Sequence, residues 1–153
     1  MLSLPANEWP LLLRGLLALA LIALAAIDWR SRRVPSAVCY ALAVATVIAA
    51  LTGPGAPGAA AGGLLCLGLG IAGYALGRLR YASEALGKGD IAIATFVGTI
   101  AGVSTAPLAL VIGVLANAAA GLWNLASGRL SLRGSTPFGA ALCLGGLIVV
   151  LRP

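Results

Sequence analysis

The sequence predicts an all-α integral membrane protein with six transmembrane helices. Of its 153 residues, 61% are hydrophobic and only 9% are charged, so the chain cannot cover itself with a water-facing surface. Apolar stretches alternate with charged or Gly/Pro-rich breaks, and a span needs about 20 mainly apolar residues. The expected spans belong to one membrane-embedded domain over residues 1–153 and cover 10–27, 36–51, 59–79, 91–105, 107–126 and 137–151.

The first apolar stretch is predicted to be a retained helix. The segment before it, MLSLPANEWP, lacks the basic residues of a secretory signal and carries Glu8 instead, and the stretch is long for the apolar core of a signal. The second, fourth and sixth stretches are short. We expect them to reach bilayer thickness with the help of flanking residues or local thinning of the bilayer.

The basic residues fix the expected orientation. Three connections, which follow the first, third and fifth spans, hold Arg30, Arg32, Arg33, Arg78, Arg80, Lys88, Arg129 and Arg133. The other two connections, around Pro54 and Pro107, contain no charge. Because positive residues concentrate on the cytoplasmic side, we expect a multi-pass protein of the cytoplasmic (inner) membrane with both termini outside. The net charge of +6 then reflects orientation and lipid contact, and it does not predict nucleic acid binding.

The cysteines predict packing and no metal site. Cys39, Cys66 and Cys143 all lie within spans, no CxxC pair is present, and the chain has no histidine. A zinc ion would therefore lack ligands, and no cofactor is expected. The pairs Gly73–Gly77 and Gly98–Gly102 have the GxxxG spacing that lets helix backbones approach closely.

The four acidic residues fall into two groups. Glu8 and Glu84 lie in polar connections, where a solvated carboxylate needs no further explanation. Asp28 ends the first apolar stretch in AAIDWRSRRVP, and Asp90 opens the fourth in LGKGDIAIA. On the expected topology both aspartates lie at the cytoplasmic edge of the hydrocarbon, on separate helices, so they can meet.

Each aspartate alone has a structural interpretation. Asp90 can cap its helix, and Asp28 can pair with a neighbouring arginine. Held together, however, two carboxylates share one proton, so one can activate water while the other donates to a carbonyl oxygen. Gly87 and Gly89 leave room beside Asp90 for a substrate backbone or a close helix. A peptidase is therefore favoured over two alternatives, a transport or proton-relay protein and a non-enzymatic membrane scaffold.

Three separated motifs carry a family resemblance. GKGD at 87–90 matches the GxGD signature of intramembrane aspartyl proteases, and the segment GKGDIAIATFVGTIAG that it opens is similar to the second-aspartate helix of the type IV prepilin peptidases. DWRSRRVP at 28–35 resembles the first-aspartate segment of that family, and TPFGAALCLGGLI at 136–148 resembles its terminal helix. The resemblance extends over nearly the whole chain from Ala25 onward.

The resemblance implies an aspartic endopeptidase of the membrane. Such enzymes remove the short basic leader from prepilin-like proteins at the cytoplasmic membrane face, in pilus or secretion systems. Asp28 and Asp90 would be the catalytic pair. The residues implied to bind substrate or shape the site are Gly87, Lys88, Gly89, Pro35, Pro137, Phe138 and Gly139.

The sequence departs from the family pattern at three points. Ala92 stands where many members have a lysine, and Ser36 stands where an Asn or Asp is common; both changes concern expected substrate contacts. The long N-terminal extension with paired cysteines, found in members that also methylate the new N-terminus, has no counterpart here. We therefore expect peptidase activity without methyltransferase activity and without S-adenosylmethionine.

Overall fold

The computed structural model describes residues 10–31, 34–51, 56–81, 86–128 and 136–152, except for the side chains of residues 80 and 81. Within these ranges the protein is all-α and contains no strand. Its helices are α1 (Leu11–Ser31), α2 (Ser36–Ala50), α3 (Ala56–Tyr81), α4 (Lys88–Ala126) and α5 (Phe138–Leu151). Three segments, Leu11–Ser31, Ala56–Leu79 and Lys88–Ala126, are long and apolar enough to cross a membrane, whereas α2 and α5 are shorter apolar helices. The chain is a helical membrane protein.

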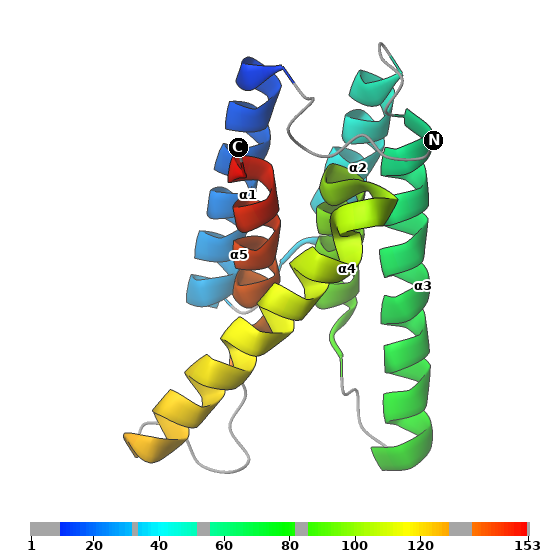
Figure 1. Ribbon diagram of the computed structural model, residues 1–153. Helices are drawn as coiled ribbons and strands as arrows, with labels where there is room; N and C mark the ends of the chain where they lie inside the picture. The colour runs from blue at the N-terminus through cyan, green and yellow to red at the C-terminus, as the bar shows by residue number, and fades with distance from the viewer. Residues whose placement is uncertain (1–9, 32–33, 52–55, 82–85, 129–135, 153) are drawn as a thin grey trace.

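The helix α4 covers both the fourth and the fifth predicted spans. Its 39 residues are interrupted at Gly102, whose φ of 70° and ψ of 165° are not helical. In Figure 1 the first segment of α4 (green) rises toward the end where α3 begins, and the second segment (yellow to gold) runs back down. The predicted boundary at 105–107 is therefore wrong. The reversal occurs at Gly102, because glycine tolerates this backbone conformation, and Pro107 lies inside the second segment.

The first segment of α4 forms the centre of the molecule. Every residue of the run 91–102 is buried, because α4 packs against α2, α3 and α5. The helix α1 is attached differently, since its main contact is with α5. Figure 1 shows that α1 ends, α4 begins and α5 begins near one another, although these elements are far apart in the sequence.

Glycines bring the helix backbones together on both sides of α4. A Cβ atom on Gly98 would collide with Cys66 and with the carbonyl oxygen of Gly62, and a Cβ on Gly62 would collide with Gly98 and Gly102. The predicted close packing at Gly98–Gly102 is confirmed. Gly73 has nothing within 4 Å of its Cβ position, so the prediction of close packing is wrong for that glycine.

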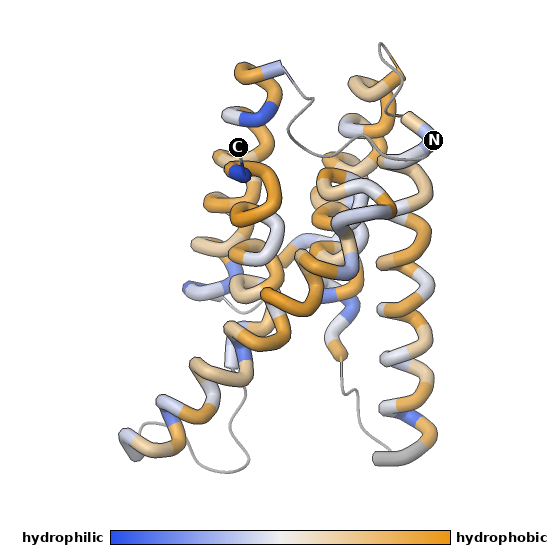
Figure 2. Tube along the Cα trace, viewed as in Figure 1, coloured by the Kyte–Doolittle hydropathy of each residue, from blue (hydrophilic) through white to orange (hydrophobic). Residues whose placement is uncertain are grey.

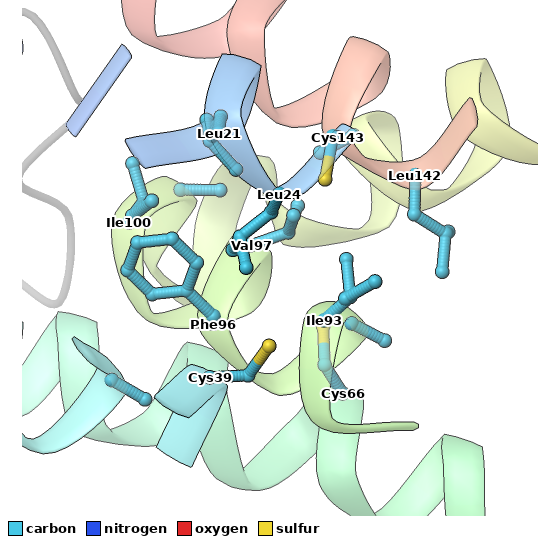
Figure 3. Packing of buried hydrophobic residues seen from close by; sticks show 14 of the residues in the cluster. Leu21, Leu24, Cys39, Cys66, Ile93, Phe96, Val97, Ile100, Leu142 and Cys143 are labelled. Carbon is cyan, nitrogen blue, oxygen red and sulfur yellow. The ribbon is translucent and has the colours of Figure 1, made fainter. Parts of the chain in front are cut away.

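Small and medium-sized apolar side chains fill the core around α4. Figure 3 shows side chains of the first segment of α4 between those of α1 and α5 on one side and Cys39 of α2 on the other. Phe96 is fully buried, and so are all three cysteines, which carry no disulfide. The predicted packing role of the cysteines is confirmed.

The outward-facing surface of the helices is apolar. Large side chains such as Leu16, Leu64 and Leu122 are more than 60% exposed, which is the pattern of a protein surrounded by lipid. Figure 2 shows hydrophobic residues along most of each helix, with strongly hydrophilic positions mainly near the helix ends. With 15 and 14 residues, α2 and α5 measure only about 20 Å, short of the roughly 30 Å hydrocarbon core.

Candidate active site

Asp28 is a buried carboxylate in the last turn of α1. Its side chain is only 6% exposed, and its Oδ2 atom accepts a hydrogen bond from the backbone N–H of Ala140 at 2.8 Å. Ala140 belongs to the first turn of α5, where backbone N–H groups have no acceptor within their own helix. Asp28 therefore satisfies an amide of another helix, 112 residues away in the sequence.

Gly139 makes this contact possible. A Cβ atom at position 139 would lie 2.9 Å from Oδ2 of Asp28 and 2.6 Å from Cδ1 of Ile93. Both distances are shorter than normal contacts, so a larger residue at this position would displace the side chains of Asp28 and Ile93. Gly139 was expected from the sequence to shape the site, and it lies directly against Asp28.

Asp90 is the third residue of α4 and is half-buried. Its Oδ2 atom accepts the backbone N–H of Gly87 at 3.3 Å, and its own N–H donates to the carbonyl oxygen of Gly87 at 3.1 Å. Gly87 is the residue that precedes the first turn of α4. The expected capping role of Asp90 is therefore present, and it holds the carboxylate against the start of its own helix.

The fold places the two aspartates within range of mutual electrostatic interaction. They come from α1 and α4, and they lie close enough to interact electrostatically. The thiol of Cys143 on α5 is within electrostatic range of both carboxylates. No ion pair to Asp28 or Asp90 occurs among the described residues, so the alternative of an Asp28–Arg30 pair is not observed. The other two arginines considered for it, Arg32 and Arg33, lie outside the described residues.

Gly89 lets the connection after α1 approach the start of α4. A Cβ at position 89 would lie 3.3 Å from the carbonyl oxygen of Val34 and 3.8 Å from its Cβ. Next to Val34, Pro35 precedes the first turn of α2, while Lys88 opens α4 with its side chain exposed. The contact between Gly89 and Val34 joins the segments that carry the two aspartates.

The start of α5 lies on the other side of Asp28. Pro137 precedes its first turn, and Phe138 is partly buried against the hydrophobic core. Beside it, the hydroxyl of Thr136 donates to Oδ1 of Asn117 at 2.8 Å, which ties the start of α5 to the second segment of α4. Pro35 and Pro137 thus each stand directly before the first turn of a helix.

Two contributors to the site were not predicted from the sequence, the N–H of Ala140 and the carbonyl of Val34. Both are backbone groups, and the residue type at a position does not indicate which partner its backbone will contact. The only available signal was the predicted helix start at Pro137, since the first amides of a helix are free donors. Among the described residues, no group of three or more His, Cys, Asp or Glu side chains is arranged to hold a metal ion.

Comparison with protein families identifies the chain. The model of the type IV leader peptidase family matches residues 15–122, which is more than half of the sequence. The chain belongs to the type IV leader peptidase family. No match was found among curated proteins or among solved structures. The matched region of this leader peptidase contains Asp28 and Asp90 and ends before α5. The protein is thus a membrane-embedded protease of the leader peptidase type.

Proposed function

We propose that this leader peptidase is an aspartic endopeptidase that uses Asp28 and Asp90 to remove the short basic leader of prepilin-like proteins. The observation that carries the proposal is that two carboxylates from different helices lie within electrostatic range of each other, inside the matched family region. In the proposed mechanism the pair holds one proton, so that one carboxyl group is protonated and the other is ionised.

The proposed chemistry is peptide hydrolysis by general acid–base catalysis. The ionised carboxylate takes a proton from water, whose oxygen attacks the scissile carbonyl carbon, while the protonated carboxylate donates its proton to the carbonyl oxygen. The tetrahedral gem-diol then collapses: the carboxyl group that took the proton from water gives it to the leaving nitrogen, the C–N bond breaks, and the other carboxylate takes back a proton from a hydroxyl of the diol. The proposed reaction needs no cofactor, and it leaves an unmodified amino group at the N-terminus of the mature substrate.

We also propose the orientation predicted from the charges. Each of the two segments of α4 would cross the membrane once. Together with the other four helices they would make six crossings, and all six would belong to one domain embedded in the cytoplasmic membrane. Arg30 lies in the last turn of α1, Arg78 in the last turn of α3 and Lys88 at the start of α4, and this side would face the cytoplasm. A substrate with a cytosolic leader and a membrane helix presents its junction at that depth. Its helix can reach the site from the lipid.

The test is the intact mass of a prepilin produced together with the wild-type protein, the Asp28→Asn variant or the Asp90→Asn variant. Asparagine keeps the size and a hydrogen-bond acceptor but cannot exchange the proton. We expect cleavage with the wild type only, with the purified variants still folded in detergent. Cleavage by both variants would exclude the aspartic mechanism, and no cleavage by any form across several prepilins would favour the transport or scaffold alternatives.

The same mass spectrum reports on methyl transfer. Hydrolysis alone leaves the mass of the mature subunit, whereas N-terminal methylation adds about 14 Da per methyl group, a shift that follows from a covalent change at the terminus. We expect the unmethylated mass. A methylated product that appears only with the wild-type protein would contradict this part of the proposal.

A further inference from the structure

We propose that the first turn of α5 positions the carboxylate of Asp28 for catalysis, with the Ala140 amide holding Oδ2 and Gly139 providing the space. The inference rests on the proposed function and adds positioning groups to it. Neither residue needs to touch the substrate. Both would act through Asp28. Among the described residues, Asp28 is the only acidic residue that the start of α5 contacts.

The packing of the helices makes α5 the element that sets the place of Asp28. The helix α1 packs mainly on α5, and α5 packs closely on α4. That second interface is tight, since a Cβ on Gly145 of α5 would collide with the carbonyl oxygen of Ala109 in α4. The packing of α5 against both α1 and α4 therefore sets the position of Asp28 relative to Asp90.

The hydrogen bond also fixes how the carboxylate is turned. With Oδ2 held by Ala140 at 2.8 Å, the group cannot rotate freely about its last bond, and Oδ1 is the oxygen left to meet water or Asp90. A donor at the N-terminus of a helix favours the charged form of a carboxylate. Near-attack geometry depends on such fixing, since a displacement of about 1 Å can lower a rate about 100-fold.

The opposite end of the same helix pair provides a control. Arg14 of α1 donates through Nε and Nη2 to the carbonyl oxygen of Val150, at 3.0 and 2.8 Å, and through Nη2 to that of Arg152 at 2.8 Å. These are carbonyls at the end of α5, which need external donors. Arg14 and Asp28 thus hold the two ends of α5, but only Asp28 is at the site.

The decisive variant is Ala140→Pro, which removes the amide hydrogen at a first-turn position where no bond of α5 itself is lost. We expect kcat for prepilin cleavage to fall about 10- to 100-fold, with KM within about twofold of the wild-type value. Ala140→Ser keeps the amide, so its kcat should stay well above that of Ala140→Pro. Gly139→Ala should lower kcat in the same way, because its methyl group displaces the carboxylate.

The control is Arg14→Gln, which loosens the far end of the α1–α5 pair. We expect a lower unfolding temperature in detergent and an unchanged kcat for the folded protein. If Ala140→Pro does not fold, Gly139→Ala tests the proposal in its place, and a lower kcat with KM within about twofold of the wild-type value again supports it.

Three outcomes overturn the proposal. A folded Ala140→Pro variant with wild-type kcat would show that the amide is not needed, and a raised KM with unchanged kcat would assign the start of α5 to substrate binding. An equal loss of kcat in Arg14→Gln would indicate general loosening of α5. Failure of the proposed function itself is distinct, because Asp28→Asn would then still cleave.

Discussion

At the scale of single residues, Asp28 combines two roles that can be separated. A buried carboxylate is costly unless it is hydrogen-bonded, and the amide of Ala140 supplies one bond at 2.8 Å. Asp28 in turn satisfies that amide, which is a structural contribution to α5. The chemistry proposed for Asp28 needs its proton exchange, whereas the structural contribution needs only an acceptor oxygen.

Asp28→Ala and Asp28→Asn should therefore differ in stability but not in activity. Both variants are expected to be inactive. Alanine leaves the Ala140 N–H without a partner, at a cost of about 1–3 kcal/mol, while asparagine can still accept its hydrogen bond. Thermal unfolding in detergent should rank the alanine variant clearly below the asparagine variant. Equal unfolding temperatures would show that the Asp28–Ala140 bond does not contribute to stability.

At the scale of helices, Gly102 determines the path of the chain through the centre. Its backbone angles, φ 70° and ψ 165°, lie in a region that is essentially restricted to glycine. Just before it, the carbonyl oxygen of Ala101 accepts the hydroxyl of Thr105, so that carbonyl has a partner where the helical pattern is interrupted. The backbone of Gly102 also lies against Gly62 of α3.

Gly102→Ala should destabilise the protein by about 1–3 kcal/mol, because alanine is strained in this conformation. Gly68→Ala is the matched control, since Gly68 lies inside α3 with nothing within 4 Å of its Cβ position, and alanine favours a helix over glycine. We expect a lower unfolding temperature for the first variant and an equal or higher one for the second. A Gly102→Ala variant as stable as the wild type would mean that the chain can continue past residue 102 without this break.

Sequence patterns predicted the approximate positions of the helices that the structure describes, because apolar runs and charged breaks report directly on the solvent around a segment. They also placed Asp28 and Asp90 at neighbouring helix ends. The break at Gly102 was assigned to Pro107 instead, since proline is the usual helix breaker and nothing local distinguishes Gly102 from the other glycines of this chain. The contacts of Ala140 and Val34 depend on how helices distant in sequence meet, and they could not be predicted from local patterns.

At the scale of the whole molecule, the orientation in the membrane has a direct test. Leu51, at the end of α2, and Ser127, at the end of α4, are both exposed and lie at opposite ends of the molecule. The three native cysteines are 0% exposed, so cysteines introduced at these positions should react with a membrane-impermeant maleimide above a low background. The wild-type protein provides that background.

We expect Leu51→Cys to react in intact cells and Ser127→Cys to react in inverted membrane vesicles, because the basic connections belong on the cytoplasmic side. The reverse labelling pattern would place the aspartates at the outer face. A substrate with a cytosolic leader could then not reach them, and the proposed function would have to change.

The bond between Asp28 and Ala140 spans 112 residues of sequence, and this separation has a consequence for biosynthesis. Both aspartates are synthesised before α5, since synthesis proceeds from the N-terminus. Until α5 is inserted, α1 lacks its main packing partner and Asp28 lacks its amide donor. On the proposed role of α5, a nascent chain that carries both carboxylates cleaves its neighbours in the membrane more slowly, and the peptidase gains its full activity when its last described helix has docked.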